Sequence, residues 1–261
     1  MTIVKHEFRQ GKHAIAIWTA SIAMLLSVCV FLFPEIKGEM GAAGELFASM
    51  GSFTAAFGMD RLNFSTLVGF YAIECGNILG LGGAFFAALI GIASLSKEEQ
   101  GHTAEFLLTH PVSRACVITE KWIAVTVQIA AMNAVMLAVS LLSMVCIGEQ
   151  IPWKEVMSLH LGYFLLQIEV AGICFGISAF LRRSSAGIGL GLAAMFYFLN
   201  LIANMTERAA FLKYLTPFGY CEGADVVTSG GLNVPMVLLG MSYAAAAIAA
   251  GYWKYCEKDI P

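Results

Sequence analysis

The chain has 261 residues, of which 59% are hydrophobic and only 13% are charged, and its formal net charge is -3. A soluble domain carries about 25% charged residues, so this composition excludes an ordinary soluble fold and indicates a membrane protein. The sparse basic residues exclude a nucleic-acid partner. The seven cysteines are scattered singly. We interpret them as small apolar residues and predict neither disulfides nor a metal or cofactor site on this chain.

The N-terminal residues 1–13 are polar and basic, with Val4 and Phe8 on one face of a possible helix. This pattern predicts a short interfacial helix that precedes the first membrane span. The apolar run that follows lacks a small-x-small cleavage site where it ends, in "FLFPEIK". We therefore expect a retained span rather than a signal peptide.

Six apolar stretches have the length of about 20 residues that an α-helix needs to cross a bilayer. Backbone polar groups in lipid must be satisfied internally, and the short alternating segments of a barrel are absent, so we predict helices. The expected fold class is an all-α membrane protein with one transmembrane domain over residues 1–261. The predicted spans are residues 14–33, 69–95, 122–147, 157–181, 186–204 and 234–253.

The basic residues predict the orientation, because cytoplasmic loops are enriched in Lys and Arg. With the N-terminus inside, ten basic residues lie inside and five lie outside. The inside set is Lys5, Arg9, Lys12, Lys97, Arg114, Lys121, Arg182, Arg183, Lys254 and Lys258, and the outside set is Lys37, Arg61, Lys154, Arg208 and Lys213. We therefore expect a multi-pass protein of the cell membrane with both termini in the cytoplasm.

Two long segments lie on the outer side in this topology. In residues 34–68, apolar side chains recur at helical spacing and predict an amphipathic helix on the membrane surface. These side chains are Leu46, Met50, Phe53 and Phe57. Residues 205–234 are too polar to span but hold apolar clusters around Pro217. They predict short helices that dip into the outer leaflet, supported by neighbouring protein.

A dense polar segment, residues 96–121, interrupts the apolar sequence on the inner side. Its Thr103–Leu108 stretch is amphipathic at helical spacing. Pro111 ends any helix there, and Ser113 is a suitable N-cap for the helix that enters the third span. The sequence thus predicts a short rigid helix along the membrane, tied at its ends to the second and third spans.

The residues of this segment resemble the cytoplasmic loop of type-2 ABC exporter permeases. The resemblance is carried by Glu98, Glu99, Gly101, Thr103, Glu105, Leu107, Leu108, Pro111, Val112, Ser113, Arg114 and Lys121. The stretch "IVKHEFRQGK" is similar to the N-terminal elbow of that family, and "YLTPFGYCEGADV" is similar to its segment before the last span. The likeness therefore extends over nearly the whole chain.

The resemblance implies a coupling helix that docks on a separate ATP-binding subunit, which rocks a dimer of permease subunits between inward and outward states. The residues that would make this coupling are Glu98, Glu99, Thr103, Glu105, Phe106, Leu107, Leu108, Pro111 and Arg114. The glutamates would pair with basic side chains, and the apolar residues would fill the groove of the partner. Arg114 and Lys121 would lie at the level of the lipid headgroups.

This chain contains no phosphate-binding loop of the form G-x-x-x-x-G-K-[ST]. We therefore expect a transport subunit and not an enzyme, with ATP and Mg on the partner subunit. The sequence does not distinguish a dimer of two copies of this chain from a dimer of this chain with a paralogue. Peptides, drugs, lipids and sodium ions are all open as cargo.

Polar side chains inside the spans are candidates for a substrate pathway. Glu169 lies near the middle of the fourth span, and a carboxylate at that depth is costly and suggests a function. The alternative is a protonated Glu169 that is hydrogen-bonded to a neighbouring helix. Glu74 and Asn200 complete the candidate pathway set. We interpret Gln128, Asn133, Asn200 and Asn204 first as hydrogen-bond partners between helices.

Small residues four positions apart predict close helix packing, either within one bundle or across a dimer interface. The pairs are Gly76 with Gly80, Gly172 with Gly176, and Gly187 with Gly191.

Two other classes of membrane protein compete with the exporter. An intramembrane protease would need histidines inside the spans, and we place all five histidines at or outside the span boundaries. An ion-coupled transporter or channel would use Glu169 and would not need the polar segment. The polar segment therefore favours the exporter.

Overall fold

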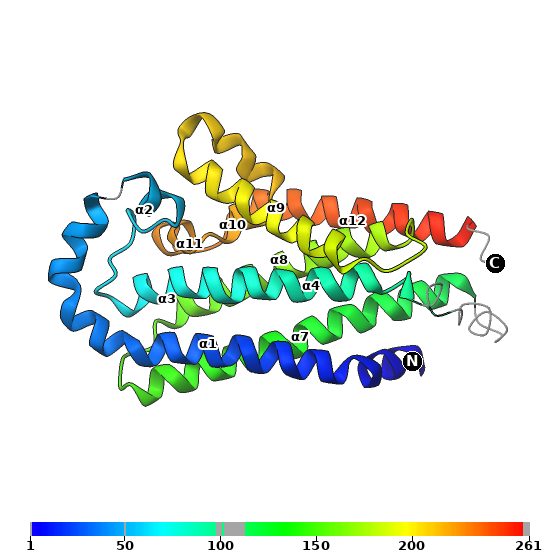
Figure 1. The fold of residues 1–261 in the computed structure, drawn as a ribbon, viewed down its shortest axis with the longest axis horizontal. Coiled ribbons are helices and arrows are strands. Elements are labelled where there is room, and N and C mark those ends of the chain that lie inside the picture. The colour runs from blue at the N-terminus through cyan, green and yellow to red at the C-terminus, as the bar shows by residue number, and fades with distance from the viewer. Residues whose placement is uncertain (1, 50, 98–100, 102–112, 258–261) are drawn as a thin grey trace.

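The computed structural model describes residues 2–49, 51–97, 101 and 113–257, and within these ranges the chain is helical with no β-strand. Six helical runs are long and apolar enough to cross a membrane, which confirms the all-α fold class. They are α1 (Thr2–Ser49), α3 (Leu67–Cys75) with η1 (Gly76–Leu81) and α4 (Gly82–Ala93), α7 (Arg114–Cys146), α8 (Trp153–Ser178), α9 (Ala186–Met205) and α12 (Val234–Glu257). The beginning of α1 and the end of α12 lie at the same end of the bundle, which we call the terminal end (Figure 1).

The first helix, α1, runs unbroken from Thr2, so a separate interfacial elbow is not confirmed. Its first turn is capped by α7, because the carboxylate of Glu120 accepts hydrogen bonds from the backbone amides of Ile3 (3.0 Å) and Val4 (3.4 Å). This cap satisfies amides that the helix itself cannot pair. The basic N-terminal turns are therefore fixed directly to the beginning of the third span.

The second span is not the single regular helix that we expected over residues 69–95. Its middle segment, η1, is a π-helix between α3 and α4. Gly76 and Gly80 allow Tyr163 of α8 to approach closely. A Cβ atom added at Gly76 would lie 2.8 Å from the Tyr163 hydroxyl, and one added at Gly80 would lie 3.1 Å from the Tyr163 ring. A π-helical turn is rare and often marks a functional site.

The fourth span, α8, is the most buried of the six and packs against α4, α7 and α12. A Cβ atom at Gly172 would lie 3.1 Å from Ala244 of α12, and one at Gly176 would lie 2.2 Å from the carbonyl oxygen of Ala247. Two of the three glycine pairs therefore serve packing within one bundle. At Gly191 a Cβ atom would meet nothing within 4 Å.

Short helices lie at the end of the bundle opposite the terminal end (Figure 1). They are α2 (Ser52–Ala56), η2 (Glu207–Leu215), α10 (Phe218–Cys221) and α11 (Gly223–Ser229). The expected short helices before the last span are thus present. All four residues of α10 are buried, and a Cβ atom at Gly223 would lie 2.3 Å from the carbonyl oxygen of Ala72. The segment is inserted between the spans rather than laid on them.

The predicted surface helix through Leu46 and Phe57 differs in the structure. The helix α1 continues to Ser49, Gly51 has a positive φ of 47°, and α2 begins a new helix at Ser52. A positive φ is compatible with glycine but not with a regular helix, and the apolar spacing alone does not reveal this interruption. Phe57 consequently lines an internal cavity instead of a membrane surface.

We expect Gly176→Ala to lower the thermal unfolding temperature of the purified protein, because the added methyl group collides with the α12 backbone. Overpacking of this kind costs about 1–3 kcal/mol. Gly191→Ala is the matched control, since it adds the same group in open space and removes a helical glycine that costs about 1 kcal/mol relative to alanine. Equal unfolding temperatures for the two variants would contradict the α8–α12 contact.

Candidate functional site

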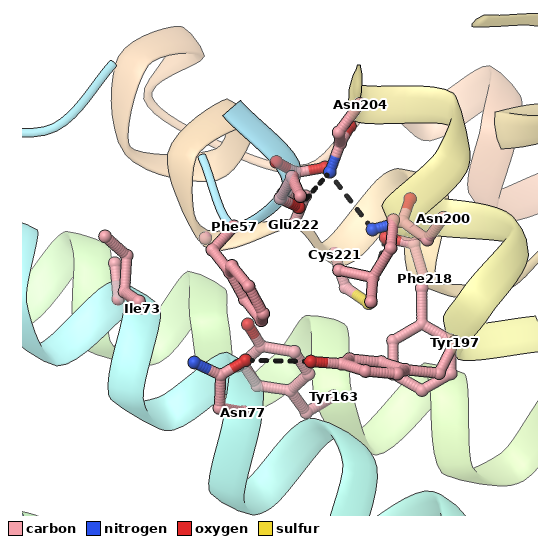
Figure 2. Close-up of a pocket in the computed structure, with 15 residues that line it drawn as sticks. Phe57, Ile73, Asn77, Tyr163, Tyr197, Asn200, Asn204, Phe218, Cys221 and Glu222 are labelled. Carbon is pink, nitrogen blue, oxygen red and sulfur yellow. Dashed lines mark hydrogen bonds between the residues drawn. The ribbon is translucent and has the colours of Figure 1, made fainter. Parts of the chain in front are cut away.

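A polar cavity of about 40 Å³ lies where η1, α8, α9 and the segment from α10 to α11 meet. Figure 2 shows that its polar side chains converge from elements far apart in the sequence. They are Asn77 of η1, Tyr163 of α8, Tyr197, Asn200 and Asn204 of α9, and Glu222 between α10 and α11. Of the three pathway candidates, only Asn200 lies here.

Hydrogen bonds join these side chains across the elements. The Tyr197 hydroxyl donates to Oδ1 of Asn77 at 3.1 Å, and Nδ2 of Asn200 donates to the carboxylate of Glu222 at 3.4 Å. Nδ2 of Asn204 donates to the carbonyl oxygen of Ala56 in α2 at 3.1 Å. The prediction that Asn200 and Asn204 make hydrogen bonds between helices is confirmed. The π-helical η1 is what places Asn77 opposite Tyr197.

Three buried oxygen atoms in the cavity residues have no hydrogen-bond partner among the described residues. They are the hydroxyl of Tyr163 and the Oδ1 atoms of Asn200 and Asn204. A cavity of this size admits a few water molecules, which ordinarily satisfy such atoms. The cavity is far below the volume of about 300–1,000 Å³ that is typical of drug-sized ligands. In this conformation it is therefore no channel for an amphipathic cargo.

An ionic cluster adjoins the cavity through Glu222, which lines it. Arg61 pairs with Glu222 at 2.5 Å and with Asp225, and Lys213 pairs with Asp225 at 2.9 Å and with Glu222 at 3.6 Å. Burial raises the pKa of Glu222 above its ordinary value, although Lys213 and Arg61 act against this. Burial lowers the pKa of Arg61, but Glu222 and Asp225 outweigh it and raise that pKa. The cluster ties the α2–α3 connection to α11 and η2.

The other two pathway candidates lie apart from this cavity. Glu169 is 1% exposed and accepts a hydrogen bond of 2.9 Å from the hydroxyl of Tyr220 in α10. Gly240 of α12 makes room for it, because a Cβ atom there would lie 2.2 Å from the carboxylate. Glu74 faces α1 instead, where Sγ of Cys29 approaches it at 3.8 Å. The three candidates therefore do not line one continuous path.

A second ionic cluster lies at the terminal end, where α1, α4 and α7 meet. Nζ of Lys121 donates to the Glu7 carboxylate at 3.0 Å and to the carbonyl oxygen of Ser94 at 2.8 Å. Lys97 pairs with the same carboxylate and donates to Gln10 at 2.9 Å. Lys121 is 1% exposed, so its side chain points into the bundle and not toward lipid, and its predicted level in the membrane stays a prediction. The Glu7 carboxylate holds it inside the protein.

The remaining coupling candidates fall mainly outside the described residues. These are Glu98, Glu99, Thr103, Glu105, Phe106, Leu107, Leu108 and Pro111. Ser113 caps α7 as predicted, since its side chain accepts a hydrogen bond from the amide of Cys116 at 3.2 Å. Arg114 donates to the carbonyl oxygens of Tyr255 and Cys256, both at 3.3 Å, and so joins α7 to the last turn of α12.

A family model described as ABC-2 family transporter protein matches residues 1–260. The chain belongs to the ABC-2 transporter family. Proteins of this family are membrane components of transporters, and this assignment agrees with the six membrane-spanning helices. No curated protein matches the chain.

A protease-like site is not formed by the described residues of this ABC-2 protein. His160 lies inside α8 and is buried, so its predicted place at a span boundary is wrong. Its Nε2 lies 2.7 Å from the hydroxyl of Tyr71, which donates to Ser140 at 2.8 Å. Ser178 donates to the carbonyl oxygen of Phe175. Ser178 and His160 lie about 27 Å apart along α8, at 1.5 Å per residue. Within the described ranges no three metal-binding side chains come together.

Several residues that make the polar contacts of this ABC-2 protein could not be recognised as such from the sequence alone. Tyr163 and Tyr220 read as ordinary aromatic residues of helices, and Glu7 reads as a charge of a solvated segment. Asn77 had one indirect signal, because the glycines on either side of it predict close approach of another helix. The contacts of these residues depend on tertiary packing, which periodicity does not encode.

We expect Tyr220→Phe to destabilise the protein by about 1–3 kcal/mol, because it leaves the buried Glu169 carboxyl without its donor. Tyr163→Phe is the matched control, since its hydroxyl has no partner among the described residues and its loss should be close to neutral. Thermal unfolding of both variants in the same detergent measures the difference. Equal decreases in unfolding temperature for the two variants would show that the hydrogen bond from Tyr220 to Glu169 does not stabilise the protein.

Proposed function

We propose that this chain is the permease subunit of an ATP-driven exporter. Two permease subunits form the substrate path, and separate ATP-binding subunits drive them through residues 96–121. ATP and Mg bind to those subunits, and the cargo is a peptide, a drug or another amphipathic compound. The family match and the sequence pattern of the polar segment support this proposal.

The observation that carries the proposal is how the two ends of the polar segment are held. Lys97, just before residue 98, and Lys121, at the second turn of α7, share the carboxylate of Glu7. Arg114 attaches the first turn of α7 to the end of α12. A force applied to the segment would therefore reach α1, α4, α7 and α12 together, which is what a coupling element requires.

The orientation follows from the distribution of basic residues, ten against five, along the chain. We place the terminal end in the cytoplasm and the chain in the cell membrane. This puts the polar segment where a soluble ATP-binding subunit has access to it. The ionic cluster around Arg61 then faces the outside.

An ion-coupled transporter that uses Glu169 is the alternative. Such a site needs a carboxylate that exchanges ions with water during transport. Glu169 is enclosed between Tyr220 and Gly240, so its surroundings favour a structural hydrogen bond.

Co-purification tests the proposal. The tagged chain is isolated in mild detergent from its native cell, and its companions are identified by mass spectrometry. We expect a soluble ATP-binding subunit at about one-to-one stoichiometry. Glu105→Arg and, separately, Leu107→Asp should weaken this association by about tenfold or more, because a contact that loses its complementarity costs at least about 1.4 kcal/mol.

Arg183→Glu is the matched control, since it reverses one charge in the other inner loop of the proposed topology. It should leave both co-purification and ATPase rate at wild-type levels. Wild-type association of both polar-segment variants would contradict the coupling role, and isolation of the chain without any ATP-binding partner would contradict the exporter itself.

A further inference from the structure

A groove of about 280 Å³ lies between α1, α4 and α7 toward the terminal end. It is several times larger than the polar cavity and close to the lower end of the range of about 300–1,000 Å³ for small-molecule sites. Its lining comes from three different spans, and Ala14 and Gln10 are exposed at its edge. The groove is thus accessible from the side of the bundle.

The deeper part of the groove is apolar. Trp18 and Phe86 lie with their ring centroids 6.4 Å apart, and Leu89 and Val125 complete this part of the wall. Trp18 lies about 16 Å from Glu7 along α1, at 1.5 Å per residue. This wall therefore lies about three turns of α1 away from the charged cluster, among apolar side chains, where a hydrocarbon chain is the natural neighbour.

The part of the groove nearest the terminal end is polar and basic. Glu7, Gln10 and Lys97 line it. Glu7 pairs with both Lys97 and Lys121, so the cluster keeps one positive charge in excess. An ammonium group has three N–H donors, and within the described ranges Lys97 uses two, toward Glu7 and Gln10. One donor of Lys97 is left for an anion.

Basic residues on the neighbouring turns of α1 add to this positive field only at longer range, because helical spacing places them on the face of α1 opposite the groove. They are Lys5, Arg9 and Lys12, and all three are exposed. A basic side chain near the membrane surface attracts anionic lipid, and the effect adds for several such chains. The gradient from basic to apolar along the groove matches one amphiphile whose headgroup is anionic.

We propose that the groove between α1, α4 and α7 binds an anionic phospholipid, with its phosphate at Lys97 and an acyl chain against Trp18 and Phe86. This site is additional to the exporter function and does not depend on it. The assignment to the inner leaflet rests on the proposed orientation. The bound lipid would lie against the Glu7 cluster, so the lipid composition would act on the helices that the polar segment moves.

Fluorescence quenching by brominated lipids tests the site, because Trp18 is part of its wall. A protein with Trp18 as its only tryptophan, the other three replaced by Phe, is reconstituted with brominated phosphatidylglycerol or brominated phosphatidylcholine. We expect phosphatidylglycerol to be favoured at Trp18 by about fivefold, as one basic contact supplies. Ala14→Phe, which fills the groove edge, should remove this preference.

Two controls separate the groove from the rest of the surface. Ala16→Phe adds the same ring at an exposed α1 position that does not line the groove, and should keep the preference. A protein with only Trp253, which is 62% exposed near the end of α12 and next to Lys254, reports on an exposed surface outside the groove, and Ala14→Phe should leave its quenching by the two lipids unchanged. Both quenchers are present in both leaflets, so the outcome is independent of orientation.

Equal quenching of Trp18 by the two lipids would overturn the proposal, as would an absence of quenching, which would mean that protein covers the groove. A preference at Trp18 that survives Ala14→Phe would also overturn it, because the attraction would then belong to the surface around the groove and not to the groove itself. None of these outcomes bears on the association with an ATP-binding subunit.

Discussion

The ammonium group of Lys121 is the charge on which the terminal end of this protein depends. It is buried at the junction of α1, α4 and α7, and the Glu7 carboxylate compensates it at 3.0 Å. A buried charge that loses its partner costs about 3–5 kcal/mol, so the three helices are held in one arrangement by this contact. Lys97 adds a second positive charge to the same carboxylate, and the first residues of the polar segment follow directly.

A second set of charges does the same at the opposite end. Arg61 and Lys213 bridge Glu222 and Asp225, which holds the inserted segment from α10 to α11 against the α2–α3 connection. Between the two ends the described polar contacts are hydrogen bonds, such as the one from Tyr220 to Glu169, and not ion pairs. Ion pairs therefore fix the relative positions of the helices at the two ends of the bundle. The middle contains few charges that would resist a relative shift of helices.

The sequence predicts the architecture well, because a bilayer imposes strict rules on composition and length. All six spans are found, Ser113 caps α7, and the short helices before the last span are present. The first two glycine pairs pack within the bundle, which was one of the two interpretations, the other being packing across a dimer interface. Each of these features depends on local chemistry that a short stretch of residues carries by itself.

The features that could not be predicted from the sequence are those that depend on a partner residue far away in the chain. The burial of Lys121 is one of them, since the Glu7 that neutralises it lies far away in the chain. His160 looked like a boundary residue, but Tyr71 gives it a partner inside the bundle. The π-helical η1 contains Gly76 and Gly80, but glycines alone do not distinguish a π-helical turn from close packing of two regular helices, and here Tyr163 lies against both. Much of the polar segment lies outside the described residues, so its helix stays a prediction.

The central claim is that the Glu7 cluster transmits the work of the ATP-binding subunit to the spans. The most direct test is the ATPase rate of the assembled complex with Glu7→Gln, Lys121→Met and both changes together. Glu7→Gln leaves Lys121 buried without its carboxylate and should remove most of the permease-dependent rate. Lys121→Met should restore the thermal stability of the Glu7→Gln protein, because the lone buried charge is gone, but it should not restore the rate, because the ionic link between α1 and α7 is then absent. Wild-type rates with Glu7→Gln, or a wild-type rate in the double variant, would contradict the claim.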